Sequence, residues 1–149
     1  VKVGTRVESH IKIIPYATSP KKIIHLVSGG PRLLKNGRIY VSKYGEKFKM
    51  DVAKGRTART AIGITKDGEL LLVTVNGLPR KEKNKRKFKS TGTSLEELSN
   101  LMLALGAVDA MNLDGGSSST MVINKKVVNR PASGYQRRVG NAIIVRPKI

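Results

Sequence analysis

The chain contains 149 residues, 39% of them hydrophobic, and its 29 Lys and Arg residues against 10 Asp and Glu residues give a formal net charge of +19. This length suffices for one domain that buries roughly 70% of its unfolded surface, so we expect a single domain over residues 1–149. The absence of cysteine excludes a disulfide framework and a thiolate zinc site, and no apolar run approaches the ~18 residues of a membrane span.

The amino-terminal region is expected to form short strands. Residues Val1–Ile14 alternate loosely between apolar and polar side chains, which predicts one or two edge strands. Lys22–Val27 predicts another short strand, which contains His25 and ends at the turn Ser28–Pro31. We interpret His25 as a structural residue, because no neighbour in sequence would orient it for catalysis.

Two hairpins are predicted in the next part of the chain. Asn36-Gly37 is a strong turn signal, and it leads into an expected strand at Arg38–Val41. Further along, Thr57–Thr65 and Glu69–Val75 are rich in β-branched and apolar residues. The segment Lys66–Gly68 between them reads as a hairpin turn.

A basic block separates these strands from the rest of the chain. Residues Arg80–Lys89 read RKEKNKRKFK, which we interpret as a solvated loop, with a dedicated anion-binding element as the alternative. The net charge would attract any polyanion, including nucleic acid, anionic lipid headgroups and phosphate-containing glycans. Because 4% of the residues are aromatic and none is Trp, a stacking platform for single-stranded nucleic acid is poorly supported.

A helix from Ser94 to Leu105 is predicted by signals at both ends. Thr93 or Ser94 serves as N-cap, Glu96 or Glu97 completes a capping box, and Gly106 ends the helix. Helical spacing places five apolar residues on one face, which we expect to pack in the core: Leu95, Leu98, Leu101, Met102 and Leu105.

A buried strand, Val108–Leu113, is expected after this helix. Together with the helix and the strand Glu69–Val75 it suggests a crossover unit. The strand runs into the sequence Asp114-Gly115-Gly116, so the crossover would place this loop at a strand's carboxyl end, where α/β folds often bind ligands.

The loop after this strand, DGGSSST, combines a carboxylate, two glycines and several hydroxyls. Glycines let the backbone come close to a ligand, and successive N–H groups in such a turn form an anion-binding concavity. Asp114 could then act as a general base, as an acid or as a clamp on sugar hydroxyls. The alternative is a tight turn whose serines cap neighbouring backbone groups.

The carboxy-terminal part predicts one more hairpin and a final strand. Met121–Ile123 and Lys126–Val128 read as a hairpin about Asn124-Lys125. A polar loop then leads to an expected strand at Val139–Val145. This strand includes Gly140, and a glycine inside a strand can mark the close approach of another backbone or a ligand.

Four segments of the chain, in their sequence and their order, resemble motifs of the phosphodiester glycosidase family. They read RTAIGI, LGAVDAMNLDGGSSSTMV, VVNRP and RRVGNAIIV, and they begin at Arg59, Leu105, Val127 and Arg137. The resemblance extends from about Ser28 to the end of the chain. It implies an α+β domain, for which we expect a mixed, mostly antiparallel sheet with one main helix packed on it.

Two departures from the family pattern are visible. Ser117 stands where the loop of the family usually carries a third glycine. Nothing in the chain matches the Asn-Gly-Gly-aromatic motif that members normally carry further upstream. We therefore expect the chain to correspond to the carboxy-terminal two-thirds of the family domain, or to a shortened relative.

The resemblance implies hydrolysis of a sugar-1-phosphodiester, such as one carrying GlcNAc, with a phosphate-containing glycan as substrate. Asp114 and Arg59 are the expected catalytic residues. Asp114 is the carboxylate of the loop, and Arg59 carries a guanidinium, whose planar fork matches phosphate oxygens. The residues expected to bind substrate come from strand ends and loops, which we expect to converge: Thr60, Gly115, Gly116, Ser117, Ser118, Asn129, Arg138 and Asn141.

Two other functions fit parts of the sequence. A non-catalytic module that binds anionic cell-envelope polysaccharide would use the basic surface, and nucleic-acid binding would explain the charge but not the DGG loop. The sequence predicts no cofactor, no metal ligand set and no specific nucleic-acid partner, and it leaves a divalent metal requirement and the oligomeric state open. We expect an extracellular or cell-envelope location, although the amino terminus shows no signal peptide.

Overall fold

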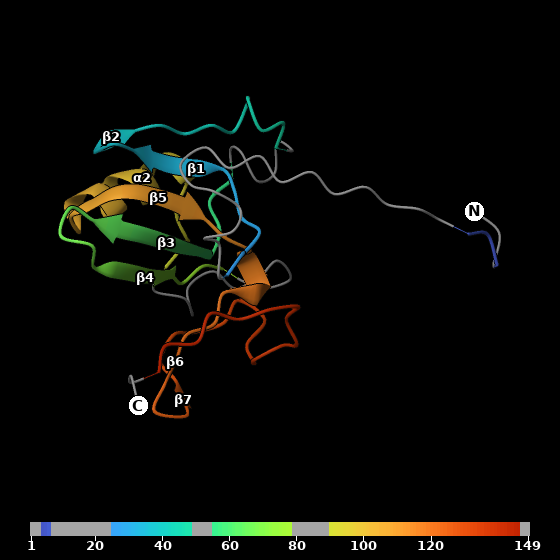
Figure 1. Ribbon diagram of the computed structural model, residues 1–149. Helices are drawn as coiled ribbons and strands as arrows, with labels where there is room; N and C mark the ends of the chain where they lie inside the picture. The colour runs from blue at the N-terminus through green and yellow to red at the C-terminus, as the bar shows by residue number, and fades with distance from the viewer. Residues whose placement is uncertain (1–3, 7–24, 49–54, 79–89, 147–149) are drawn as a thin grey trace.

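The computed structural model describes residues 4–6, 25–48, 55–78 and 90–146. Within these ranges, one five-stranded sheet is covered by helix α2, and a separate two-stranded hairpin lies beyond the end of the sheet (Figure 1). The expected α+β class, with a mostly antiparallel sheet and one main helix, is confirmed. The basic block Arg80–Lys89 lies entirely outside the described residues, and most of Val1–Ile14 lies outside them too.

The sheet has the strand order β2-β1-β5-β3-β4. Every pairing between its described strands is antiparallel. Strands β4 and β5 both flank β3, so they run parallel to each other without pairing, and α2 connects them as the predicted crossover unit. The bounds of the strands are Arg32–Lys35 (β1), Arg38–Ile39 (β2), Arg59–Thr65 (β3), Leu70–Val75 (β4) and Ala107–Asn112 (β5).

Both predicted hairpins of the sheet are present. Asn36 and Gly37 have φ values of 51° and 72°, the left-handed conformation that a two-residue hairpin turn requires at both central positions. Gly68 has φ 86°, and the Glu69 N–H donates to the Thr65 hydroxyl at 3.0 Å beside the backbone bonds of the turn. Local turn chemistry therefore fixes the register of both strand pairs.

Helix α2 spans Leu95–Ala104, and its start shows the predicted capping box. The Glu97 N–H donates to the Ser94 hydroxyl at 3.2 Å, and the Ser94 N–H donates to the Glu97 carboxylate at 2.9 Å. These two bonds satisfy backbone donors that the first turn leaves free. At the other end, Gly106 has φ 89°, as expected of a residue that ends a helix.

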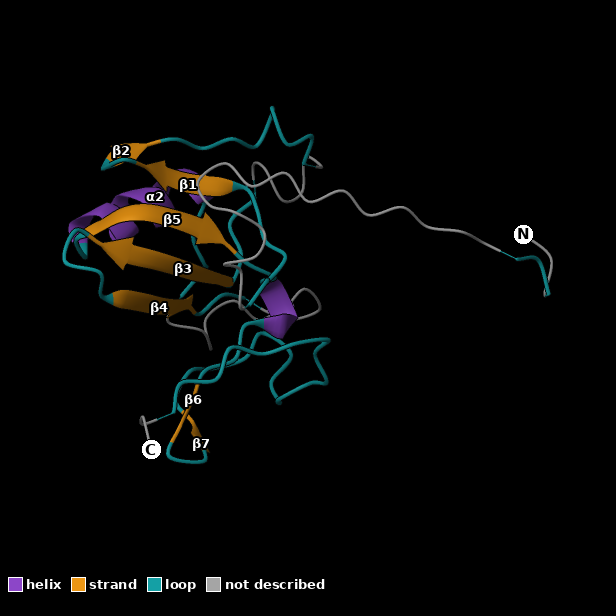
Figure 2. Ribbon diagram, viewed as in Figure 1, coloured by secondary structure: helices purple, strands orange, loops and turns teal. Residues whose placement is uncertain are grey.

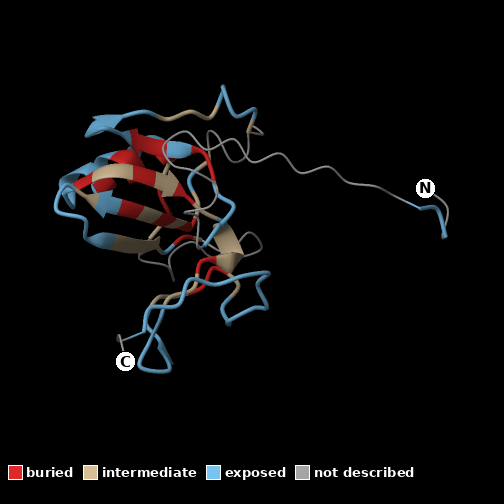
Figure 3. Cartoon of the chain, viewed as in Figure 1, coloured by how far each residue is buried: buried red, intermediate tan, exposed pale blue. Residues whose placement is uncertain are grey.

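The core lies between α2 and the sheet (Figure 3). Its fully buried large side chains are Leu33, Leu34, Leu95, Leu98 and Met102. Of the predicted helix face, Leu101 and Leu105 are 38% and 47% exposed, so the expectation that they pack in the core was wrong. A single helix on one sheet buries a narrow stripe, and these two residues lie at its margin.

The chain continues past the sheet as a C-terminal arm, residues 120–146. The predicted hairpin forms its centre, with β6 at Val122–Ile123 and β7 at Lys126–Val127. Asn124 and Lys125, at the turn, have φ values of 49° and 64°. The short helix η3, Gly116–Ser118, lies where the sheet gives way to the arm (Figure 2).

Two expected strands are absent from the described residues. Val139–Val145 forms no strand and is exposed along its length, because no neighbouring strand in the described part of the chain pairs with it. In Lys22–Val27, residues 25–27 are not a strand, while residues 22–24 lie outside the described ranges. His25 is exposed. Apolar alternation alone did not suffice in these segments, since a strand also needs a hydrogen-bonded partner.

Candidate active site at the carboxyl end of strand β5

The carboxyl end of β5 continues between two other segments. On one side, the Leu113 N–H donates to the Thr60 carbonyl at 2.8 Å. On the other side, the Gly30 N–H donates to the Asn112 carbonyl at 2.6 Å, and the Asn112 N–H donates to the Pro31 carbonyl at 3.0 Å. The segment before β1 therefore forms one wall beside the loop that begins at Asp114.

The glycines of the loop permit its close approach to the start of β3. The Gly116 N–H donates to the Ala58 carbonyl at 2.7 Å. A Cβ added at Gly115 would lie 2.9 Å from the same carbonyl oxygen, so a larger residue there would push the loop away. Gly116 has φ 61°, the left-handed region that favours glycine.

The carboxyl end of the loop is anchored by polar side chains. Ser119 is 1% exposed, and the Thr60 hydroxyl donates to its oxygen at 3.0 Å. Asn129 donates to the Ser119 carbonyl at 2.9 Å and accepts from the Met121 N–H at 2.8 Å. Thr60 and Asn129, both predicted to bind substrate, thus contact the loop itself and hold it in place.

The Asp114 carboxylate lies on the outside of this anchored loop. Its side chain is exposed, and no residue in the described ranges donates a hydrogen bond to it or forms an ion pair with it. The side chain is therefore accessible from solvent, where a bound molecule could reach it. A fixed backbone with a free carboxylate is the arrangement that a general base or a hydroxyl clamp requires.

Arg59 occupies a different environment from the one predicted. It is 3% exposed, and its guanidinium donates to the Thr93 carbonyl at 3.2 Å and to the Gly55 carbonyl at 2.7 Å. Burial lowers the pKa of this guanidinium, while the charge of Glu96 raises it. Neighbouring side chains on a strand point to opposite faces, so Arg59 lies on the helix side and Thr60 on the side of Ser119. The Arg59 guanidinium thus donates to backbone carbonyls on the helix side, and it forms no ion pair with Asp114, although Gly115 packs beside its Cα.

A neighbouring arginine reaches the loop instead. The Arg137 Nη1 group donates to the Ser117 hydroxyl at 2.8 Å across twenty residues of sequence. Arg138 and Asn141, which the sequence singled out, are exposed on the arm. Both arginines lie in the segment RRVGNAIIV, and the sequence alone does not tell which of two adjacent side chains turns toward the loop.

Asn112, which the sequence analysis did not single out, is a buried polar residue directly before the loop. It is 4% exposed, and its side-chain amide donates to the Gly30 carbonyl at 2.8 Å and to the Leu113 carbonyl at 3.0 Å. Its side-chain oxygen is buried and accepts no hydrogen bond from the described residues. The amide bonds tie the wall at Gly30 to the end of β5, which keeps the two backbones beside the loop in a fixed relation.

The described residues contain neither a metal-binding cluster nor a membrane span. Among the described side chains, no group of three or more His, Cys, Asp or Glu residues is arranged to hold a metal ion. No helix in the described ranges has the length and apolar character needed to cross a membrane.

Comparison with known sequences places these features in a family. The chain matches the family described as phosphodiester glycosidase over residues 2–146, so the match begins upstream of Ser28, from which the motifs alone indicated a resemblance. It is 28% identical to N-acetylglucosamine-1-phosphodiester alpha-N-acetylglucosaminidase of Bos taurus, over 95% of this chain and 28% of that protein. The Homo sapiens protein of the same name is 27% identical, over 89% of this chain and 26% of that protein. The chain thus spans about a quarter of the length of these relatives.

Solved structures show the same likeness. A hypothetical protein from Synechocystis superposes with a TM-score of 0.58 at 31% sequence identity, covering 70% of this chain and 18% of that one. The zebrafish N-acetylglucosamine-1-phosphodiester alpha-N-acetylglucosaminidase catalytic domain, auto-inhibited by its pro-peptide, gives a TM-score of 0.57 at 27% identity. That match covers 70% of this chain and 34% of the zebrafish chain.

Proposed function

The chain belongs to the phosphodiester glycosidase family, because the family match covers residues 2–146, and on this basis we propose a function. We propose that the protein hydrolyses a sugar-1-phosphodiester. The bond concerned joins the anomeric carbon of the sugar to a phosphate oxygen. The names of the relatives specify N-acetylglucosamine in this linkage, so a GlcNAc-1-phosphodiester is the substrate we propose for this chain. The natural substrate in this proposal is a phosphate-containing glycan at the cell envelope or outside the cell.

The observation that carries this proposal is the free carboxylate of Asp114 on an anchored loop. The loop is held to β3 through the Ala58 carbonyl and to the arm through Asn129. A catalytic group must keep its position as charge develops on the substrate, and a fixed loop supplies that without reorganisation. An exposed aspartate on a mobile turn would lack this property.

The chemistry needs one carboxylate in this loop. We propose that Asp114 accepts a proton from water, whose oxygen bonds to the anomeric carbon while the carbon–oxygen bond to phosphate breaks. The bonding electrons stay on the phosphate oxygen, which leaves as a phosphomonoester. Alternatively, the carboxylate stabilises the oxocarbenium-like centre of the transition state directly. Phosphate is a weak base as a leaving group, so the reaction does not demand a strong general acid.

The test is to incubate the protein with a GlcNAc-1-phosphodiester that carries a methyl group on the phosphate, and to measure free GlcNAc. We expect release by the wild-type chain and a loss of about 100-fold or more in Asp114→Asn, because the amide cannot accept the proton. The matched control is Asp67→Asn, in the β3–β4 turn, which should keep full activity. Thermal unfolding should be unchanged in both variants, because neither carboxylate takes part in packing.

Other outcomes distinguish the alternatives. Full turnover in Asp114→Asn would exclude Asp114 from the chemistry. Binding of an anionic glycan without any release of GlcNAc, by wild type and variant alike, would favour the non-catalytic binding module.

A further inference from the structure

The placement of arginines around the DGG loop differs from the expectation of a clamp that includes Arg59. The Arg59 guanidinium is buried against backbone carbonyls, and Arg32 forms an ion pair with Asp109 at 3.3 Å. Arg56 is paired with Glu97. Each of these guanidinium groups therefore already has a partner within the protein.

Arg137 combines contact with the loop and access to solvent. Its Nη1 group donates to the Ser117 hydroxyl at 2.8 Å, and the residue is exposed. A guanidinium has five N–H donors in a planar fork, and the bond to Ser117 uses one of them. In the described part of the chain, no carboxylate forms an ion pair with Arg137, so its charge is not neutralised by the protein there.

The position of Ser117 ties this arginine to the proposed site. Ser117 is the central residue of η3 and follows Asp114 by three positions. The backbone on both sides of Ser117 is fixed, by the bond from Gly116 to Ala58 and by the buried Ser119. The hydroxyl thus orients the fork from a rigid base, on the same loop that presents the free carboxylate.

Resting on the proposed function, we infer that Arg137 is the residue that selects for the phosphate of the substrate. Its fork binds the phosphodiester oxygens through charge-assisted hydrogen bonds, with Ser117 as the positioning residue. Asp114 and Arg137 then act on opposite sides of the scissile bond, the carboxylate on the sugar and the guanidinium on the leaving phosphate. Ser117, which stands where the family usually has glycine, has a specific role in this proposal, because glycine would offer no hydroxyl to hold the Arg137 guanidinium.

The experiment compares two substrates with the same sugar. One is the methyl GlcNAc-1-phosphodiester, and the other is the 4-nitrophenyl glycoside, which has a good leaving group but no phosphate. Arg137→Lys keeps the charge and loses the fork, so kcat/KM for the phosphodiester should fall about 10- to 100-fold, as for a lost hydrogen bond to a charged group, with little change for the neutral glycoside. Arg146→Lys, on the same arm, is the matched control and should change neither rate.

A binding measurement keeps the inference independent of turnover. Dimethyl phosphate, titrated into the ¹⁵N-labelled protein, should shift the backbone N–H signals of residues 115–119, and Arg137→Lys should weaken that response at least several-fold. A response that survives in Arg137→Lys, or that is lost in Arg138→Lys instead, would overturn the assignment. So would an equal loss of kcat/KM for both substrates, which would make Arg137 a structural support of the loop.

The two proposals fail in different ways. If dimethyl phosphate binds at the loop through Arg137 but no GlcNAc is released by the wild type, the phosphate site stands and the proposed function is wrong. If GlcNAc is released and the phosphate preference is unaffected by Arg137→Lys, the proposed function stands and the inference is wrong.

Discussion

A buried guanidinium that donates to backbone carbonyls has a structural effect whether or not it meets substrate. Arg59 joins three parts of the chain, since Gly55 precedes β3 and Thr93 precedes helix α2. Removing these donors takes the guanidinium bond from the half-buried Gly55 carbonyl, and it leaves the Thr93 carbonyl with the Thr57 N–H as its remaining backbone donor. At the scale of one residue, these two bonds give Arg59 a structural role, and in our proposal Arg137 recognises the charge of the phosphate.

This assignment predicts the behaviour of Arg59→Lys. Lysine keeps the charge but cannot donate in two fixed directions, so the free energy of unfolding in urea should fall by about 1–3 kcal/mol. Arg38→Lys, at an exposed position on β2, should change the same quantity by less than about 0.5 kcal/mol. Unchanged stability in Arg59→Lys, together with a large loss of turnover, would return Arg59 to the phosphate clamp.

The sequence predicted the loop of the candidate site and the residue types around it, but not the direction of individual side chains. Asp114 and the two glycines could be singled out because a carboxylate, a tight backbone and hydroxyls occur together there. Arg59 and Thr60 differ by one position, and that difference puts them on opposite faces of β3. Arg137 and Arg138 present the same difficulty, because they lie in an irregular arm where no sequence period fixes direction.

At the scale of elements, helix α2 shows how a local signal becomes part of the site. Its capping box fixes the residues before the helix, where Thr93 pairs with Thr57 across an isolated bridge. Thr57 precedes Ala58, whose carbonyl receives the loop. The start of α2 thus supports the backbone on which the DGG loop rests.

The carboxylate of this capping box gives the stability of the protein a pH dependence. The pKa of Glu97 is lowered, first by the hydrogen bond from the Ser94 N–H and then by Arg56. A lowered folded-state pKa means that the stabilisation is complete above the unfolded value of 4.5 and is lost as the pH falls through the folded-state pKa. We therefore expect the midpoint of thermal unfolding to fall when the pH is lowered below about 4.5.

Glu97→Gln isolates this contribution, because glutamine can still accept the capping bond but carries no charge. The variant should unfold at a lower temperature than the wild type at pH 7, and the difference should shrink toward pH 3. Glu69→Gln, in the β3–β4 turn, serves as control. Its unfolding temperature should follow that of the wild type from pH 7 to pH 3. A gap between Glu97→Gln and wild type that stays constant from pH 7 to pH 3 would contradict the assignment.

Elements with local signals were predictable, and those that depend on distant partners were not. Asn36-Gly37 and Lys66–Gly68 specify turns through their own backbone preferences, and both hairpins formed. Val139–Val145 has the apolar residues of a strand, but it lacks a paired neighbour among the described residues. Pairing is a property of the whole sheet, which a single stretch of sequence does not contain.

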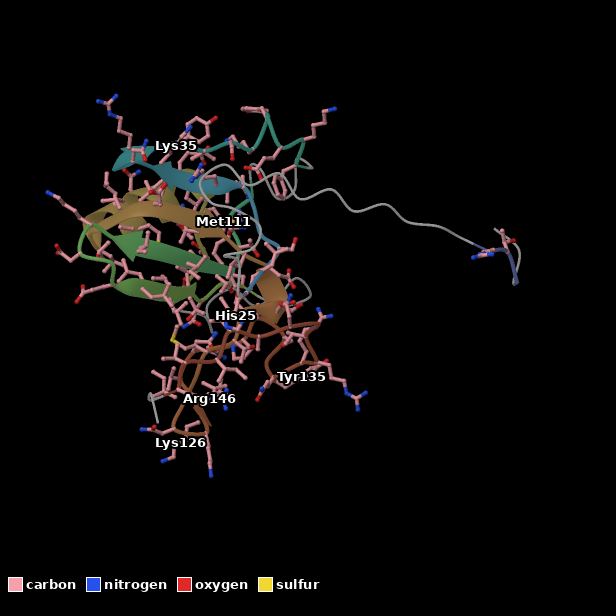
Figure 4. All side chains as sticks on the ribbon, in the orientation of Figure 1. His25, Lys35, Met111, Lys126, Tyr135 and Arg146 are labelled. Atoms are coloured by element: carbon pink, nitrogen blue, oxygen red, sulfur yellow. The ribbon has the colours of Figure 1, made fainter. Side chains whose placement is uncertain are left out.

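At the scale of the whole molecule, the C-terminal arm combines basic side chains with exposed aliphatic ones and contains no carboxylate. No Asp or Glu follows Asp114 in the sequence. Lys126 and Arg146 lie on the arm beyond the sheet (Figure 4), near exposed aliphatic side chains such as Ile123 and Ile144. An anion that approaches the loop from this side meets a positive field with no opposing carboxylate from the arm.

The net charge of +19 allows a test that separates capture of substrate from chemistry. Four lysines of the basic block, whose positions lie outside the described residues, are replaced together by serine: Lys81, Lys83, Lys85 and Lys87. Charges steer an anion over about a Debye length, ~8 to 10 Å at 0.10 to 0.15 M salt by a general estimate, so the variant should bind an anionic polymer more weakly at low salt.

The affinity is measured against polyphosphate at increasing NaCl concentration, and the salt dependence should be shallower than for the wild type. Saturated turnover of a small GlcNAc-1-phosphodiester should change little, because steering acts before the substrate is bound. Replacing the same four lysines by arginine keeps the charge and should restore wild-type capture. An equal loss of saturated turnover in the serine variant would instead place the basic block in the active site.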